Sequence, residues 1–167
     1  PEGYKLVSFD YGQIEARLFG VVTADPDFCE ILTKNYDIHL ENSRFLFGDE
    51  LAKKFRGPVK NGTFAMLYGA GDEKIAETAG APIEKVAQLR ELVFGRFKQF
   101  KVWQNSTVQF ERKHGYVESL FGRRRRSPMS HTELLNHTTQ STASDMTLSA
   151  MNALGRRYDV AFMVHDD

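Results

Sequence analysis

Four residues recur at every fourth position of the segment RGPVKNGTFAMLYG: Arg56, Lys60, Phe64 and Tyr68. On an α-helix, a spacing of four keeps side chains on roughly one face, so this segment predicts a stripe of two cations followed by two aromatic rings. Cations bind the oxygens of a polyphosphate, and aromatic rings stack on a flat base. An ordinary apolar core is the alternative for the two rings, but a core stripe would not continue into Arg56 and Lys60.

Two aspartates outside this segment could complete a site for metal-assisted nucleotidyl transfer. Asp10 follows the apolar run YKLVSF, and Asp166 comes just after the run DVAFMV near the other end of the sequence. Carboxylates are ligands that Mg²⁺ prefers, and a pair of such ions clamps the attacking and leaving oxygens of a phosphoryl transfer. In isolation, Asp10 would equally suit a helix N-cap and Asp166 a turn. The chemistry requires the two carboxylates to meet in space.

Six motifs, taken in order along the chain, resemble those of the DNA polymerase I family (family A). Its signature motifs DYSQIELR, RxxxKxxxF/YxxxYG and VHDE are matched by DYGQIEAR from Asp10, by the stripe ending at Tyr68 and Gly69, and by VHDD ending at Asp167. The family pattern also includes DIH from Asp37, YVESLFGRRR from Tyr116, and NxxxQxTAxD from Asn136. One motif would be weak evidence, whereas six in order cover nearly the whole chain.

The resemblance implies a polymerase palm with a partial antiparallel sheet and a helical fingers subdomain, both incomplete. It assigns residues 1–24 and about 116–167 to the palm and about 25–115 to the fingers, as one partial polymerase domain over 1–167. Periodicity predicts the same class, α+β and mostly helical. Helices are expected over 13–22, from Pro26, and over 37–47, 58–68, 72–78, 82–100, 102–113 and 131–158. Strands are expected over 4–9 and 159–164, and a hairpin from 116 to 120 with its Gly-Arg-rich exit.

Pro58 affects where the helix of the cationic stripe should begin. Proline suits the first helical position, because it lacks an N–H that would be unpaired there. A helix that begins at Pro58 would leave Arg56 just outside it, although a long side chain would still reach a phosphate.

Roles for single residues follow from the resemblance. Catalysis is assigned to Asp10, Asp166 and Lys60, and two Mg²⁺ ions to Asp10, Asp166 and the backbone carbonyl of Tyr11. The incoming deoxynucleoside triphosphate is assigned to seven side chains: Gln13, Glu15, His39, Arg56, Lys60, Phe64 and Tyr68. Glu15 would exclude ribonucleotides, and Phe64 in place of tyrosine would disfavour dideoxynucleotides. A structural histidine is the alternative for His39, and a surface carboxylate for Glu15.

The resemblance also assigns the binding of template–primer DNA to residues in the C-terminal third of the chain. The side chains concerned are Arg123, Arg124, Arg125, Asn136, Gln140 and His165. Arginines on phosphates give an affinity that weakens with salt, although a basic run is also typical of a solvated face or a localisation patch. Asn136 and Gln140 lie four apart on one expected helix, so both could read the minor-groove acceptors that all correct base pairs share.

Composition limits the other classes of protein to which the chain could belong. Lys+Arg and Asp+Glu both number 22, so net charge does not indicate a partner. The lone Cys29 excludes a disulfide framework and a zinc site, and no run approaches the ~18 apolar residues of a membrane helix. We expect no membrane partner, a monomer, and the cytoplasm of a bacterial cell or a phage-infected host. Both ends look cut, which indicates an internal piece of a larger protein that would be inactive alone.

Two other functions stay open from the sequence. One is a nucleic-acid-binding fragment without catalysis, and the other is a relative of the single-subunit RNA polymerases. Glu15 and the pair Asn136 and Gln140 favour the DNA enzyme over the RNA enzyme.

Overall fold

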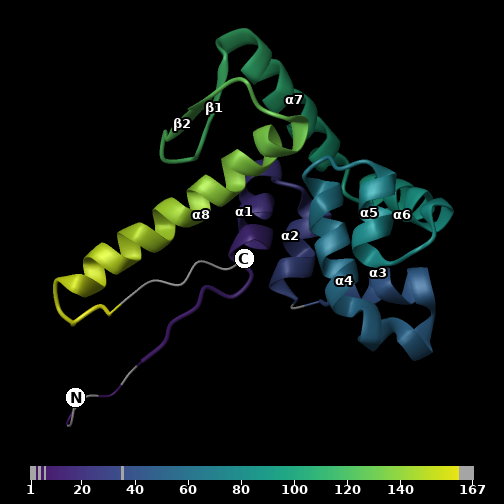
Figure 1. The fold of residues 1–167 in the computed structure, drawn as a ribbon, viewed down its shortest axis with the longest axis horizontal. Coiled ribbons are helices and arrows are strands. Elements are labelled where there is room, and N and C mark those ends of the chain that lie inside the picture. Colours follow the sequence, from purple (N-terminus) through teal and green to yellow (C-terminus); the bar gives the residue numbers. More distant parts are fainter. Residues whose placement is uncertain (1–2, 4, 6, 35, 162–167) are drawn as a thin grey trace.

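The computed structural model describes residues 3, 5, 7–34 and 36–161 (Figure 1). These residues form eight helices and one hairpin: α1 (Ile14–Thr23), α2 (Pro26–Thr33), α3 (Ile38–Phe47), α4 (Asp49–Leu67), α5 (Asp72–Ala79), α6 (Ile83–Arg96), α7 (Lys98–His114), β1 (Tyr116–Glu118), β2 (Arg124–Arg126) and α8 (His131–Gly155). The two strands pair antiparallel, with Val117 opposite Arg125. The prediction of a mostly helical α+β fold with a small antiparallel sheet is confirmed.

Helix α4 begins at Asp49, and Pro58 lies inside it. The prediction that the helix starts at Pro58 and leaves Arg56 outside is therefore wrong. Contacts with α3 on both sides of the proline explain why the helix continues. The Ser43 hydroxyl donates to the Ala52 carbonyl at 2.8 Å, and the Asn42 amide donates to the Thr63 hydroxyl at 3.1 Å. This packing offsets the single backbone hydrogen bond that proline removes.

The helix expected over 82–100 is divided in two. Helix α6 ends at Arg96, Phe97 adopts a non-helical conformation, and α7 begins at Lys98 instead of the expected Val102. A buried carboxylate explains the new start, because Asp25 accepts from the Phe28 amide at 3.1 Å and from the Gln99 amide at 3.0 Å. One side chain thus caps α2 and also binds an amide in the first turn of α7.

The strands expected at the two ends of the chain do not form in the residues described there. Residues 7–9 and 159–161 have no strand conformation, and residues 4, 6 and 162–164 lie outside the described part. Val7 and Phe9 are 66% and 77% exposed, and Figure 1 shows the residues before α1 running away from the helices. Strand backbone needs a partner for its N–H and C=O groups, and none lies beside these residues in the described part.

An aromatic cluster joins α1, α4 and α7. The Phe19 ring lies 5.0 Å from that of Tyr68, 5.4 Å from that of Phe100 and 5.6 Å from that of Trp103. Gly69 then ends α4 with φ +80°, and a Cβ there would lie 2.6 Å from Nε2 of His131. Glycine is required at this close approach, which brings the end of α4 against the start of α8.

No helix in the described ranges combines the length and the apolar character needed to cross a bilayer.

Candidate active site

A pocket of about 140 Å³ lies between the start of α1 and helices α2, α3 and α4. Its polar and aromatic lining includes four residues that the sequence assigned to nucleotide binding: Gln13, His39, Arg56 and Phe64. They come from segments that are far apart in the chain. The structure therefore brings together an amide, an imidazole, a guanidinium and an aromatic ring. Glu15, Lys60 and Tyr68, which received the same assignment, are not among the residues that line it.

Gln13 enters the pocket from an unusual backbone conformation. It precedes α1 with φ 57° and ψ 39°, in the left-handed region, and its side chain does not cap the helix. Few non-glycine residues adopt this conformation, and those that do are often found at functional sites. Its side chain is exposed and available to a ligand.

Arg56 is held by Asp37, a residue at the start of α3. The Arg56 Nε donates to Oδ2 of Asp37 at 2.7 Å, and the Leu40 amide donates to Oδ1 at 3.0 Å. Partial burial would raise the pKa of Asp37, but the hydrogen bonds from Arg56 and Leu40 together hold it below its ordinary value. Asp37 therefore stays ionised at neutral pH and fixes Arg56 against the N-terminus of α3.

His39 is neutral in this environment. Burial, followed by the positive charge of Arg56, lowers its pKa to about 4. Its Nδ1 atom is buried and has no hydrogen-bond partner among the described residues. The ring centroid lies 5.4 Å from that of Phe64. A buried nitrogen without a partner is costly, so it favours a ligand group that could bond to it.

Lys60 and Phe64 occupy successive turns of α4. Lys60 is exposed, and its Nζ lies 6.0 Å from the centre of the Phe64 ring. Phe64 is half-buried and stacks on Phe19 at 6.3 Å. Phe64 thus packs against the core through its contact with Phe19 and also lines the pocket.

Tyr68 lies deeper than the rest of the stripe. It follows the last residue of α4, and only 5% of it is exposed. Its hydroxyl lies 3.0 Å from that of Thr139 on α8. Burial, and then the charge of nearby Glu15, raises the pKa of Tyr68, so its hydroxyl stays protonated. In this structure Tyr68 connects the aromatic core to α8.

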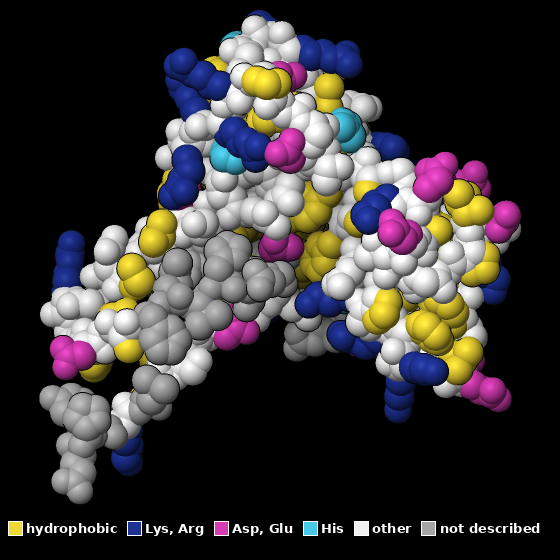
Figure 2. Space-filling view, in the orientation of Figure 1, with side chains coloured by type: hydrophobic (Ala, Val, Ile, Leu, Met, Phe, Trp, Pro, Cys, Tyr) yellow, Lys and Arg dark blue, Asp and Glu magenta, His cyan; other side chains and the backbone are white. Residues whose placement is uncertain are grey.

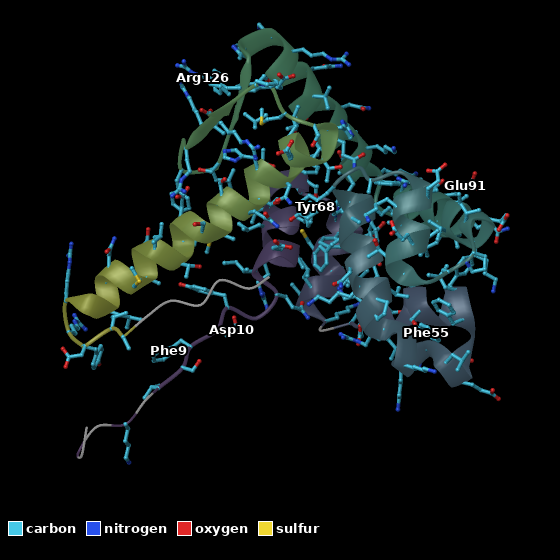
Figure 3. All side chains as sticks on the ribbon, viewed as in Figure 1. Phe9, Asp10, Phe55, Tyr68, Glu91 and Arg126 are labelled. Atoms are coloured by element: carbon cyan, nitrogen blue, oxygen red, sulfur yellow. The ribbon has the colours of Figure 1, made fainter. Side chains whose placement is uncertain are left out.

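The residues assigned to metal lie partly outside the described ranges. Asp10 is exposed on the segment before α1, next to exposed Tyr11 (Figure 3). Asp166, His165 and Asp167 lie beyond the last described residue, so the meeting of Asp10 and Asp166 stays a prediction. Among residues 3, 5, 7–34 and 36–161, no three or more His, Cys, Asp or Glu side chains are grouped to hold a metal ion.

The donor atoms at Asp10 and Tyr11 are of the type that Mg²⁺ binds. A carboxylate and a backbone carbonyl are hard oxygen ligands, and Mg²⁺ usually takes one or two carboxylates together with water and phosphate oxygens. The exposed segment therefore fits part of a magnesium site.

Each of the three arginines assigned to DNA is paired with a carboxylate. Arg123 pairs with Asp145, Arg124 with Glu118 at 3.0 Å, and Arg125 with Glu133 at 2.7 Å. Figure 2 shows the basic side chains over the hairpin with acidic and histidine side chains among them. Arg126 at the end of β2, labelled in Figure 3, is exposed and has no ion pair within the described residues. Arg126 was not among the arginines predicted to bind DNA.

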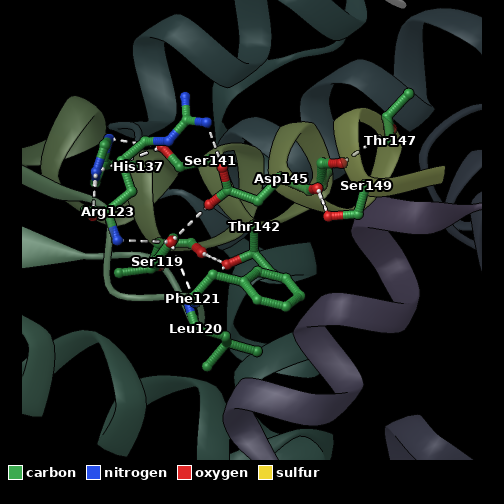
Figure 4. A network of polar contacts seen from close by, with 12 residues as sticks. Ser119, Leu120, Phe121, Arg123, His137, Ser141, Thr142, Asp145, Thr147 and Ser149 are labelled. Atoms are coloured by element: carbon green, nitrogen blue, oxygen red, sulfur yellow. Dashed lines mark hydrogen bonds and ion pairs between the residues drawn. The ribbon is translucent and has the colours of Figure 1, made fainter. Parts of the chain in front are cut away.

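A polar network joins the hairpin loop to α8 (Figure 4). The Ser119 hydroxyl donates to Asp145 at 2.9 Å and accepts from the Arg123 amide at 3.2 Å. The Leu120 amide donates to the Thr142 hydroxyl at 2.9 Å. The motifs YVESLFGRRR and NxxxQxTAxD are thus in direct contact. Sequence reasoning gave no role to Ser119, Thr142 or Asp145, although all three belong to those motifs.

Asn136 and Gln140 lie on the same helix, as predicted. Gln140 is exposed, whereas Asn136 is half-buried, and its Oδ1 atom is buried without a partner in the described part of the chain. Asn136 resembles His39 in this respect.

Comparison with known proteins gives a consistent result. The model of DNA polymerase family A matches residues 1–167. The chain is 29% identical to the thermostable DNA polymerase I of Thermus aquaticus over 99% of this chain and 22% of that protein. It is 32% identical to DNA polymerase I of Helicobacter pylori over 98% of this chain and 20% of that protein.

A solved structure shares the fold as well. The POL domain of Pol1 from M. smegmatis, in complex with DNA primer-template and dNTP, matches with a TM-score of 0.69 and 25% identity. The match covers 87% of this chain and 30% of that chain. The chain spans about a fifth of the length of the curated relatives it matches.

Proposed function

Because the chain belongs to DNA polymerase family A, we propose that it forms part of the catalytic region of an enzyme that adds deoxynucleotides to a primer 3′ end, as a template directs, and releases pyrophosphate. The observation that carries this proposal is the pocket that Gln13, His39, Arg56 and Phe64 line together. A nucleoside triphosphate needs cations and hydrogen-bond donors for its phosphates and a flat apolar surface for its sugar and base. The lining supplies both.

The phosphate side of the site consists of Arg56, Lys60 and His39. Arg56 and Lys60 would stabilise the negative charge that shifts to the leaving pyrophosphate. His39 is neutral and keeps one N–H, so it would donate a hydrogen bond without adding charge. Phe64 would lie against the sugar and base. Gln13, Glu15 and Tyr68 complete the proposed nucleotide-binding set, with Glu15 excluding a 2′-hydroxyl.

Two Mg²⁺ ions are the proposed cofactor, with Asp10, Asp166 and the Tyr11 carbonyl as ligands. When bound, such ions stabilise the attacking and leaving oxygens of the transfer. The exposure of Asp10 and Tyr11 supports their share of this role, because both remain open to an ion and a substrate.

Template–primer DNA is the proposed partner of the hairpin and α8. Arg123, Arg124 and Arg125 would contact phosphates, Asn136 and Gln140 would reach the minor groove, and His165 is assigned to the same partner. We further propose that residues 1–24 and about 116–167 form the palm and that about 25–115 form the fingers.

Primer extension by the full-length protein, with and without Mg²⁺, tests the proposal. Lys60→Ala should lower kcat/KM on the order of 100-fold, because a charge that stabilises the transition state is lost. Lys53→Ala is the matched control, since Lys53 is an exposed lysine on the same helix, about two turns before Lys60, and no motif assigns it a role. DNA binding without extension would instead support a non-catalytic binding protein, and a preference for ribonucleotides would support an RNA polymerase.

A further inference from the structure

Asp37 is the acidic residue in the lining of the nucleotide pocket, and the family motifs gave it no role beyond its place before His39. Its two carboxylate oxygens have different partners. Oδ1 accepts from the Leu40 amide at 3.0 Å and so caps α3, whereas Oδ2 accepts from Nε of Arg56 at 2.7 Å. One side chain therefore joins the start of α3 to the middle of α4.

The geometry of the Arg56 contact matters for a ligand. A guanidinium carries five N–H donors, and Asp37 accepts only from the one on Nε. The two terminal nitrogens make no hydrogen bond to the described residues, and the Arg56 side chain is 41% exposed. These terminal groups are the ones that bind two phosphate oxygens side by side.

Asp37 also determines the surroundings of His39. It caps the helix whose first turn carries His39, and both side chains line the same pocket. Its negative charge balances Arg56, which lies close to His39 and Lys60. Without this carboxylate, Arg56 would be free to rotate away from the pocket, since long exposed side chains lose entropy when they are fixed.

We propose that Asp37 is a positioning residue of the nucleotide site: it holds Arg56 through Nε so that both terminal nitrogens are available to the incoming triphosphate before the nucleotide arrives. This inference rests on the proposed function. Preorganisation of this kind lowers the cost of binding, because the arginine is already ordered when the ligand enters. Asp37 itself does not contact the reacting atoms.

Asp37→Asn separates positioning from a merely structural role. Asparagine caps a helix as well as aspartate does, so α3 should be preserved while the charge is lost. In the full-length protein we expect the KM for deoxynucleotides to rise about tenfold with kcat changed less than about threefold, because a charged contact that orders the binding site is removed. The melting temperature should stay close to that of the wild type.

Two further variants complete the test. Asp49→Asn removes the carboxylate of another α3–α4 ion pair, Arg44–Asp49 at 3.1 Å, and should leave KM unchanged. In an Arg56→Ala background, Asp37→Asn should have little additional effect on KM, because Asp37 acts through Arg56.

An unchanged KM in Asp37→Asn, or additive effects of the two substitutions, would overturn the positioning role while the wild-type enzyme still extends primers. A wild-type protein that does not extend primers at all would overturn the proposed function itself, and the positioning role with it.

Discussion

His39 in the pocket and His137 on α8 are both half-buried, but their surroundings differ. The His137 Nδ1 atom lies 2.9 Å from the Ser141 hydroxyl, and its Nε2 atom lies 3.3 Å from the Arg123 carbonyl. The Nδ1 atom of His39 has no partner in the described part of the chain. Both ring nitrogens of His137 therefore have partners, whereas one nitrogen of His39 in the pocket has none among the described residues.

The cations of the two regions are more alike than the histidines. Each of Arg123, Arg124 and Arg125 is paired with a carboxylate. In the pocket region, Arg56 is likewise paired with Asp37 through one nitrogen, and Lys60, like Arg126 on the hairpin, has no ion pair among the described residues. The difference between the regions therefore lies in the histidines, while Arg123 and Arg125 help to hold the hairpin against α8 through their ion pairs with Asp145 and Glu133. Contacts from the hairpin arginines to DNA would use their remaining N–H groups or require a change of partner.

The largest effect should come from breaking the network on the hairpin side. Asp145→Ala removes the carboxylate that accepts hydrogen bonds from Ser119 and Arg123. The buried Ser119 hydroxyl would then have lost its acceptor. We expect the free energy of local unfolding to fall by about 3 kcal/mol, because a buried polar group loses its hydrogen-bond partner and a charged contact is lost with it. Hydrogen exchange of the Leu120 and Arg123 amides should become faster, since both bond to this network.

Glu118→Ala provides the control on the same hairpin. It removes the partner of Arg124, but the Arg124 and Glu118 side chains are 60% and 37% exposed, so the loss of stability should be much smaller. Equal exchange rates in Asp145→Ala and the wild type would show that the hairpin does not depend on this network.

A smaller effect is expected from His39, and it depends on pH. The pKa of His39 is lowered from 6.5 to about 4, so between these values the unfolded chain binds a proton that the folded chain does not. Stability should therefore fall as the pH drops from 6.5 to 4, because protonation of this residue favours the unfolded chain. His39→Gln should remove this part of the pH dependence in denaturant unfolding curves.

His137→Gln is the matched comparison. Burial also lowers the pKa of His137, but the Arg123 carbonyl opposes the shift. The substitution His137→Gln should therefore change the pH dependence of stability less than His39→Gln does. The reverse order would mean that the pocket is not the region with the uncompensated histidine.

Local signals predicted the elements whose causes are local. Asp25-Pro26 marked the start of α2, and the Gly-Arg-rich segment marked the hairpin. The start of α4 and the break at Phe97 were missed, because residues distant in sequence decide them. Ser43 and Asn42 support α4 around Pro58, and Asp25 binds the first turn of α7. No pattern within the affected segments reports such contacts.

The site shows the same division. The resemblance to the family selected four residues that line the pocket, because family motifs record which side chains meet. It could not show that Asp37 binds Arg56, that Tyr68 is bonded to Thr139, or that the hairpin arginines are already paired. These are pairings between distant positions, and either partner alone is an ordinary polar residue.

The smallest effect should come from Arg126, the hairpin arginine without an ion pair in the described ranges. If paired arginines contribute less to DNA binding than unpaired ones, Arg126→Gln should lower the salt slope of DNA affinity by about 1, because one phosphate contact is lost. Arg124→Gln should lower it less, since Arg124 already bonds to Glu118 and lies 4.5 Å from the centre of the Tyr116 ring. Binding to a primer–template duplex at several salt concentrations measures both slopes, with Lys113→Gln on α7 as an exposed control outside the proposed surface. A larger change for Arg124→Gln would show that the internal ion pairs yield to DNA.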